Sequence, residues 1–167
     1  MKVKKYNNFH DFIINLQHKV HVLLAFPVLA FILLFVRIEN SRYHPFISNK
    51  DLLYLMRSSM LILTLSIIIL SVIYFSFQMN KIRKLTGLRD KLNRYYLVST
   101  IRDYLLATLL VLNLGGMVLT GDRFYTIFFS ISLIVMLSGY PSHSRIINSL
   151  KLNPEESQKA MSQDTLE

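Results

Sequence analysis

The chain has 167 residues, a formal net charge of +9 and no cysteine. The lack of cysteine excludes disulfides, thiol catalysis and cysteine-ligated metal sites. Apolar residues make up 52% of the chain and are gathered into blocks almost free of charge, so the sequence predicts an all-α membrane protein. The alternative, a soluble helical bundle, would need a polar stripe along every helix, and the longest apolar block offers only small hydroxyls.

The segment 6–18 precedes the first apolar block and has lysines on both sides. Its apolar side chains recur at i, i+3, i+4 and i+7, at Phe9, Phe12, Ile13 and Leu16. This spacing makes one apolar helical face. We therefore expect a short amphipathic helix that lies in the membrane interface.

The first predicted span is residues 20–36, bounded by Lys19 and Arg37. About 20 apolar residues are needed to cross the hydrocarbon core, with a lower limit near 17, which this block just meets. A signal peptide is the alternative, but the apolar run is too long and no small-residue cleavage site follows it. Pro27 lies inside the span and is either a hinge or a tolerated membrane proline.

The second predicted span is residues 58–79. Ser48 and Asp51 resemble a capping box, which would start the helix well before the span. The helix could then continue for about 35 residues, or about 50 Å, and would overshoot the bilayer. Gly87 is the expected turn, and residues 88–99 would begin the next helix, so that a charged hairpin projects below the membrane.

The third predicted span, residues 100–121, carries the polar residues that need explanation. Alternating steps of four and three residues along this helix run through Tyr95, Ser99, Arg102, Leu106, Leu109, Asn113, Gly116 and Thr120, and this line holds most of its polar or small residues. We name Arg102, Asn113, Gly116 and Thr120 the α-seam. Arg102 falls at the membrane edge, where an arginine can snorkel, whereas Asn113 lies deep and needs a partner. Gly116 and Thr120 allow a second helix to come close. The α-seam either packs against the other spans or faces a partner subunit or a second copy.

The fourth predicted span, residues 124–141, follows the third after a very short connection, so the two should be antiparallel neighbours. Ser142 can cap a short C-terminal helix whose apolar strip would lie on the inner membrane surface. The members of this strip are Ile146, Ile147 and Leu150. Residues 1–152 are thus expected to form a single four-span bundle, and residues 153–167 a polar tail.

Lysines and arginines divide unevenly between the two sides of this topology. With four spans, thirteen of the nineteen fall on the side of both termini, five fall on the other side, and Arg102 lies at a helix end. The positive-inside rule therefore predicts cytoplasmic termini, and we expect a bacterial plasma membrane. The same rim would attract anionic lipid headgroups, which accounts for the net charge without nucleic acid as a partner.

The sequence contains no motif for a reaction, and its acidic residues are scattered, so we expect a non-enzyme with no catalytic residue, metal site or bound cofactor. Two histidines, His21 and His143, come out at a similar depth near the basic rim. A haem could be held between them across two helices, although interfacial histidines are the simpler interpretation.

These observations favour a non-catalytic accessory or assembly subunit of a larger membrane complex, because the soluble parts are too small for an active site and no other span carries a deep charge. Its partner would be another membrane protein or a second copy. A small oligomeric transporter or channel built around span three is the alternative, and a haem anchor is the third hypothesis.

Overall fold

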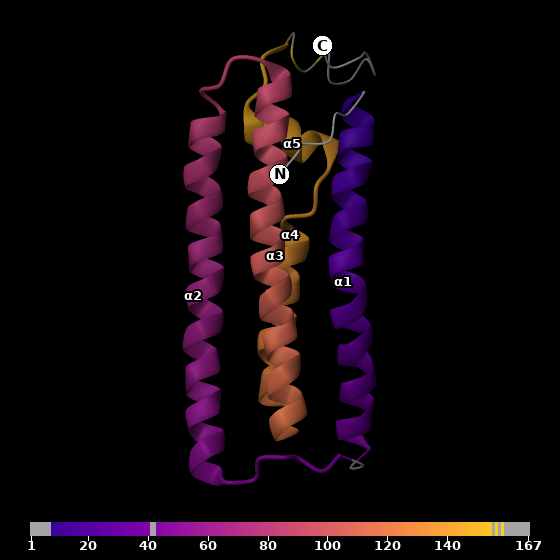
Figure 1. Ribbon diagram of the computed structural model, residues 1–167, viewed down its shortest axis with the longest axis vertical. Helices are drawn as coiled ribbons and strands as arrows, with labels where there is room; N and C mark the ends of the chain where they lie inside the picture. Colours follow the sequence, from indigo (N-terminus) through magenta and orange to yellow (C-terminus); the bar gives the residue numbers. More distant parts are fainter. Residues whose placement is uncertain (1–7, 41–42, 155, 157, 159–167) are drawn as a thin grey trace.

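The computed structural model describes residues 8–40, 43–154, 156 and 158, and these residues contain helices and no strand (Figure 1). The helices are α1 (Phe9–Glu39), α2 (Lys50–Ile82), α3 (Leu88–Thr120), α4 (Phe124–Ser138) and α5 (His143–Leu150). Figure 1 shows α3 between α1 and α2, with α4 behind it and α5 near one end. We call this the α5 end, and the opposite end, which holds the connection 43–49, the loop end.

Three of these helices, α1, α2 and α3, are long and apolar enough to cross a membrane. The helix α4 has only 15 residues, about 22 Å at 1.5 Å per residue, which is shorter than the hydrocarbon core. It meets the same criterion only together with α5, from which it is bent by 77°. The number of spans is therefore three, or four if this bent pair counts as one.

The helix α1 differs from the expectation of a separate interfacial helix over residues 6–18. The described part of this segment is continuous with the first apolar block, and α1 also runs through Pro27 without a break. The apolar face of Phe9, Phe12, Ile13 and Leu16 is buried in the protein rather than left for the membrane surface. Nothing in the sequence interrupts the helix between the two segments, and a packed surface is available to cover this face.

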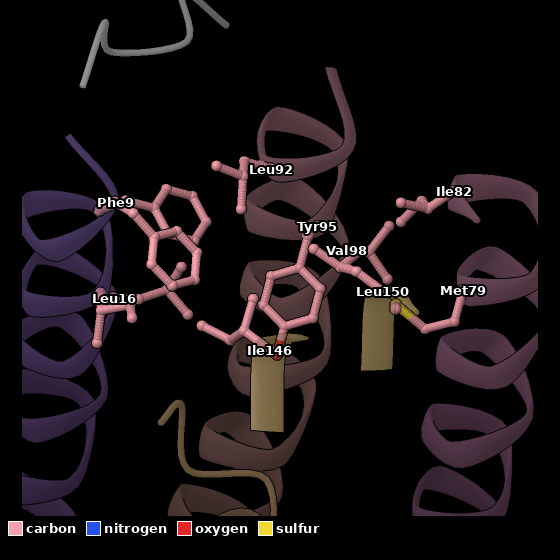
Figure 2. Packing of buried hydrophobic residues seen from close by; sticks show 11 residues of the cluster. Phe9, Leu16, Met79, Ile82, Leu92, Tyr95, Val98, Ile146 and Leu150 are labelled. Carbon is pink, nitrogen blue, oxygen red and sulfur yellow. The ribbon is translucent and has the colours of Figure 1, made fainter. Parts of the chain in front are cut away.

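The surface that covers this face comes from α3 and α5 (Figure 2). Figure 2 shows Phe9 and Leu16 of α1 beside Leu92 and Tyr95 of α3, with Ile146 of α5 between the helices. The apolar strip of α5 is therefore turned into the protein, where Ile146 and Leu150 are fully buried and Ile147 packs against the same cluster. The expected helix exists, but its strip contacts other helices.

The long second helix and the hairpin after it agree with the sequence. α2 has 33 residues and begins after Asn49, one residue later than the expected Ser48, because the Asn49 side chain accepts hydrogen bonds from the amides of Asp51 and Leu52. Gly87 makes the turn with a φ of 101°, which is unfavourable for other residues, and α3 starts directly after it. Both helices thus have the predicted extent.

The loop end is closed by contacts between the connections and the central helix. The amide of Ile47 donates to the carbonyl of Leu119 at 3.0 Å, which lays the connection 43–49 across the end of α3. Gly121 ends α3 in the left-handed conformation with a φ of 62°. Arg57 of α2 forms an ion pair with Asp122 in the short connection to α4. α3 and α4 are antiparallel neighbours, as expected (Figure 1).

Candidate functional site

The central helix α3 packs against α1, α2 and α4, and three members of the α-seam, Asn113, Gly116 and Thr120, are buried inside the chain. The hydroxyl of Thr120 donates to the carbonyl of Gly116 at 2.8 Å, within its own helix. The α-seam therefore lies against helices of the same chain, and a second copy could not reach these three residues without displacing them.

Gly116 of α3 lies directly against a side chain of α4. A Cβ atom added at Gly116 would lie 2.8 Å from Cζ of Tyr125 in α4 and closer still to the ring edge, so only glycine fits. The neighbouring Gly115 is different, because a Cβ atom there would meet nothing within 4 Å. The two adjacent glycines thus have opposite surroundings: Gly116 faces α4, whereas Gly115 faces out of the bundle.

Asn113 is 1% exposed and does not bond to another helix. Its Nδ2 donates to the carbonyl of Leu109 at 2.9 Å, one turn back on α3, and its Oδ1 has no partner among the described residues. An unpaired amide oxygen in a dry interior is costly. The partner that the sequence led us to expect on a neighbouring helix is therefore not supplied by the described part of this chain.

Arg102 is turned into the bundle rather than extended to the membrane surface, and its side chain is only 12% exposed. Its Nη2 donates to Oδ1 of Asp103 at 2.8 Å and to the carbonyl of Gly139, at the end of α4, at 3.0 Å. The guanidinium also lies 4.7 Å from the ring centroid of Phe75 in α2. Arg102 thus links α3 to α2 and α4. Its position along the predicted span suggested only a side chain at the membrane edge and did not reveal these contacts.

Asp103 is the buried counter-charge of this cluster, with a side chain that is 2% exposed. The hydroxyl of Ser99 also donates to its carboxylate, at 3.4 Å. Asp103 lies one residue outside the α-seam, which is why the periodic pattern did not select it. The sequence signal for this buried ion pair was that Asp103 directly follows Arg102.

A half-buried cation, Lys19, was also missed by the sequence analysis. Its Nζ donates to Thr100 of α3 at 3.0 Å and lies about 5 Å from the ring centroids of both Tyr96 and Tyr104. This arrangement fixes α1 to α3 through hydrogen-bond and cation–π contacts. The sequence offered only a lysine at the edge of an apolar block, which usually reads as a membrane-surface anchor.

The two weak ligand candidates have different neighbours. The ring of His21 lies 3.2 Å from the hydroxyl of Tyr140, measured from Nε2, whereas His143 stacks against His10 with ring centroids 5.8 Å apart. No group of three or more potential metal ligands occurs among the described residues. Pro27, the hinge candidate, is a buried residue inside the continuous α1.

The buried hydroxyl of Thr64 in α2 has no hydrogen-bond partner among the described residues, whereas other hydroxyls of the apolar helices bond to their own backbone. Three of them donate to a carbonyl three or four residues back at 2.7 to 2.8 Å, and these are Ser71, Ser132 and Ser138. A hydroxyl that is bonded in this way does not need a partner on another helix or a water-filled path. These residues therefore give little support to a polar route through the bundle.

A concavity between α2, α3, α4 and α5 has a volume of about 250 Å³ and lies toward the α5 end. Two arginines, Arg83 and Arg102, line it together with Ser76, Ser138 and Ser149. No carboxylate is among its lining residues. We name it the arginine cavity, because two arginines and no carboxylate line it.

Comparisons with protein-family models, with curated proteins and with solved structures found no match. The function is therefore argued from the residues and geometry of this chain alone.

Proposed function

We propose that this protein is a non-catalytic accessory or assembly subunit of a larger membrane complex, with α1, α2, α3 and the α4–α5 pair crossing the membrane and both termini in the cytoplasm. The basic residues near the α5 end support this orientation, because Lys81, Arg83, Lys84, Arg89 and Arg94 all surround the turn between α2 and α3. We further propose a bacterial plasma membrane as its location.

The observation that carries the proposal is an uncovered strip on α3. Although α3 is the central helix, one side of it is exposed along its length, and Figure 1 shows α3 bounded there by α1 and α2 on either side. We define the α3 strip by its exposed residues, which are Ile101, Tyr104, Leu105, Thr108, Val111, Leu112, Gly115 and Leu119. Its two small residues would let the backbone of another helix come close.

Packing in a membrane depends on such close approach, since lipid tails are as apolar as leucine and give helices no hydrophobic reason to associate. The exposed Gly115 leaves room within the α3 strip, and Thr108 lies seven residues earlier on the same side. A transmembrane helix of another membrane protein, or of a second copy, therefore has a surface on which van der Waals contacts would exceed those of lipid.

The competing functions receive less support. A transporter formed around the α-seam would need those residues at a subunit interface, but Asn113 and Gly116 are covered by the same chain. A haem held between His21 and His143 would compete with the neighbours that each ring already has, Tyr140 and His10.

The test is photo-crosslinking in the native membrane. A photoreactive residue at Leu112, in the α3 strip, should give a discrete protein adduct, whereas the same residue at the exposed Ile134 of α4 should give mainly lipid adducts. The adduct at Leu112 is identified by mass, which distinguishes a different membrane protein from a second copy.

A substitution in the α3 strip sharpens the experiment. Gly115→Leu should weaken the Leu112 adduct strongly, because it fills the space that a partner helix would use while meeting nothing within the chain. Ser66→Leu, at an exposed position of α2, is the matched control and should leave the adduct unchanged. Lipid adducts alone at Leu112, or an adduct that survives Gly115→Leu, would refute the proposal.

A further inference from the structure

We propose that the arginine cavity binds the phosphate group of a single anionic amphiphile, such as one acidic phospholipid molecule. This inference is independent of the accessory-subunit proposal. It concerns one defined site at the α5 end, not the general attraction of a basic rim for anionic headgroups.

The first argument is the unbalanced charge of the site. The charge of Arg102 is offset by Asp103, whereas Arg83 bonds to neutral groups among the described residues. Its Nε donates to the carbonyl of Ser149 at 2.9 Å and its Nη1 to Oδ1 of Asn80 at 3.3 Å. Within the described residues Arg83 forms no ion pair. One positive charge therefore remains at the cavity without a counter-ion.

The second argument is that the positive charge continues beyond this cavity. Arg83 and Ser149 also line an adjoining, more open hollow of about 510 Å³, which Arg145 of α5 borders together with Ser142 and Ser144. No carboxylate lines this hollow either, and Arg145 forms no ion pair within the described residues. Two uncompensated guanidinium groups thus face connected space near the membrane edge, where they favour an anion.

The third argument is that each arginine of the cavity keeps one guanidinium nitrogen that makes no hydrogen bond within the described residues. These nitrogens are the Nη2 of Arg83 and the Nη1 of Arg102, and the hydroxyls of Ser76 and Ser149 line the same cavity. A planar guanidinium with free N–H groups matches the oxygens of a phosphate, often in a bidentate manner, and hydroxyls complete its shell. Each group that a phosphate needs is therefore available.

The fourth argument identifies the rest of the ligand as apolar. The cavity is also lined by the apolar side chains of Val72, Phe75, Leu106 and Val135. Val72 is also exposed on the outer surface of α2, among side chains that would face lipid. The cavity thus joins a cationic end to a hydrocarbon surface, which fits a phosphate carried by acyl chains better than a small soluble anion.

The site is tested by native mass spectrometry of the full chain in mild detergent. Phosphatidylglycerol is titrated against phosphatidylcholine, which carries a phosphate but no net charge. We expect one saturable phosphatidylglycerol adduct per chain and a clearly weaker phosphatidylcholine adduct. An adduct that does not saturate, or equal binding of both lipids, would overturn the proposal.

Two variants and one control assign the adduct to the cavity. Arg83→Gln should weaken phosphatidylglycerol binding by about tenfold, as expected for the loss of a charge-assisted hydrogen bond. Arg89→Gln removes the same charge from an exposed position outside the cavity and should have little effect. Equal losses in both variants would show that only the general surface charge matters, and would refute the site.

Ser76→Phe provides a test that keeps every arginine. Ser76 is exposed and lines the cavity, so a phenyl ring there should occupy the apolar side without disturbing the interior, and phosphatidylglycerol binding should fall while the protein elutes normally. If Arg83→Gln fails to fold, Ser76→Phe becomes the deciding test of the site. Undiminished phosphatidylglycerol binding by Ser76→Phe would contradict the proposal.

Inorganic phosphate separates the two possible sources of the anion. Competition by millimolar phosphate would support the site and identify the phosphate group alone as sufficient, so that a soluble phosphate would be the natural ligand. Resistance to phosphate, together with loss in Ser76→Phe, would support the site with a lipid as the source.

Discussion

Gly116 of α3 lies directly against the ring of Tyr125 of α4, and this contact sets how closely the two helices approach. Tyr125 is 1% exposed, so its ring has little freedom to move aside. One residue earlier, Gly115 faces open space. The pair offers a direct comparison, since the same substitution in the same helix meets opposite surroundings.

Gly116→Ala should destabilise the protein by about 1–3 kcal/mol, because the added methyl group overlaps a buried ring. Gly115→Ala should stabilise it by about 0.5–1 kcal/mol, because alanine is the better helix former and nothing obstructs it. Thermal unfolding of both variants in detergent measures the difference. Equal effects would contradict the assignment of Gly116 to the helix contact.

Asn113→Leu should leave stability unchanged or raise it by about 1 kcal/mol. The Oδ1 atom of Asn113 is buried without a partner in the described residues, and its Nδ2 bonds only to the backbone of its own helix. Replacing such an amide by an apolar side chain of similar size removes a desolvation cost. A marked loss of stability would instead indicate that Asn113 has a polar partner that the single chain does not supply.

Asp103→Asn should be strongly destabilising, by about 3–5 kcal/mol, because it leaves the guanidinium of Arg102 buried without its counter-charge. Replacing both residues, in Arg102→Met with Asp103→Leu, should recover much of this loss, since no buried charge then remains. Unfolding midpoints of the single and double variants make the comparison. A double variant less stable than Asp103→Asn would disprove the buried ion pair between Arg102 and Asp103.

Glu156 gives a prediction for pH. Burial opposes ionisation of its carboxyl, but hydrogen bonds from Lys91 and from the backbone of Asn153, with the charge of Lys91, hold the pKa below its ordinary value. A carboxyl with a lowered pKa in the folded state contributes stability that is present above the unfolded pKa and is lost as the pH falls through the folded pKa.

Wild type should therefore be more stable than Glu156→Gln at neutral pH, and this difference should vanish in acid, at a pH below the ordinary pKa of 4.5 for a glutamate. Unfolding midpoints of both proteins across the acid range provide the measurement. A difference that is independent of pH would show that the 2.8 Å contact between Lys91 and Glu156 does not contribute through charge.

The topology can be tested cleanly because the chain has no cysteine of its own. An impermeant thiol reagent should label Lys84→Cys from the cytoplasmic side and Phe46→Cys from the other side, since both positions are exposed and lie at opposite ends of α2. Arg123→Cys and His143→Cys apply the same test to the α4–α5 pair. Labelling of these last two from one side would reduce the number of spans to three.

The sequence by itself determined the helices of this protein. Uninterrupted apolar blocks, the turn at Gly87 and the cap at Ser142 act within a few residues of chain, so the extents of α2 and α3 and the start of α5 could be predicted from local signals. The cap of α2 shifted by one residue, to Asn49, because either side chain could accept the same amide bonds.

Only the tertiary structure decided which faces are covered and where the charges go. The periodicity of Phe9, Phe12, Ile13 and Leu16 defined an apolar face but could not tell membrane from protein, since both bury apolar groups equally well. In the same way, the sequence does not distinguish Gly115 from Gly116, and only the packing of Tyr125 against Gly116 makes them different. Arg102 turns inward only because Asp103, Phe75 and the carbonyl of Gly139 meet there, and these groups come from three helices whose relative placement no local signal contains.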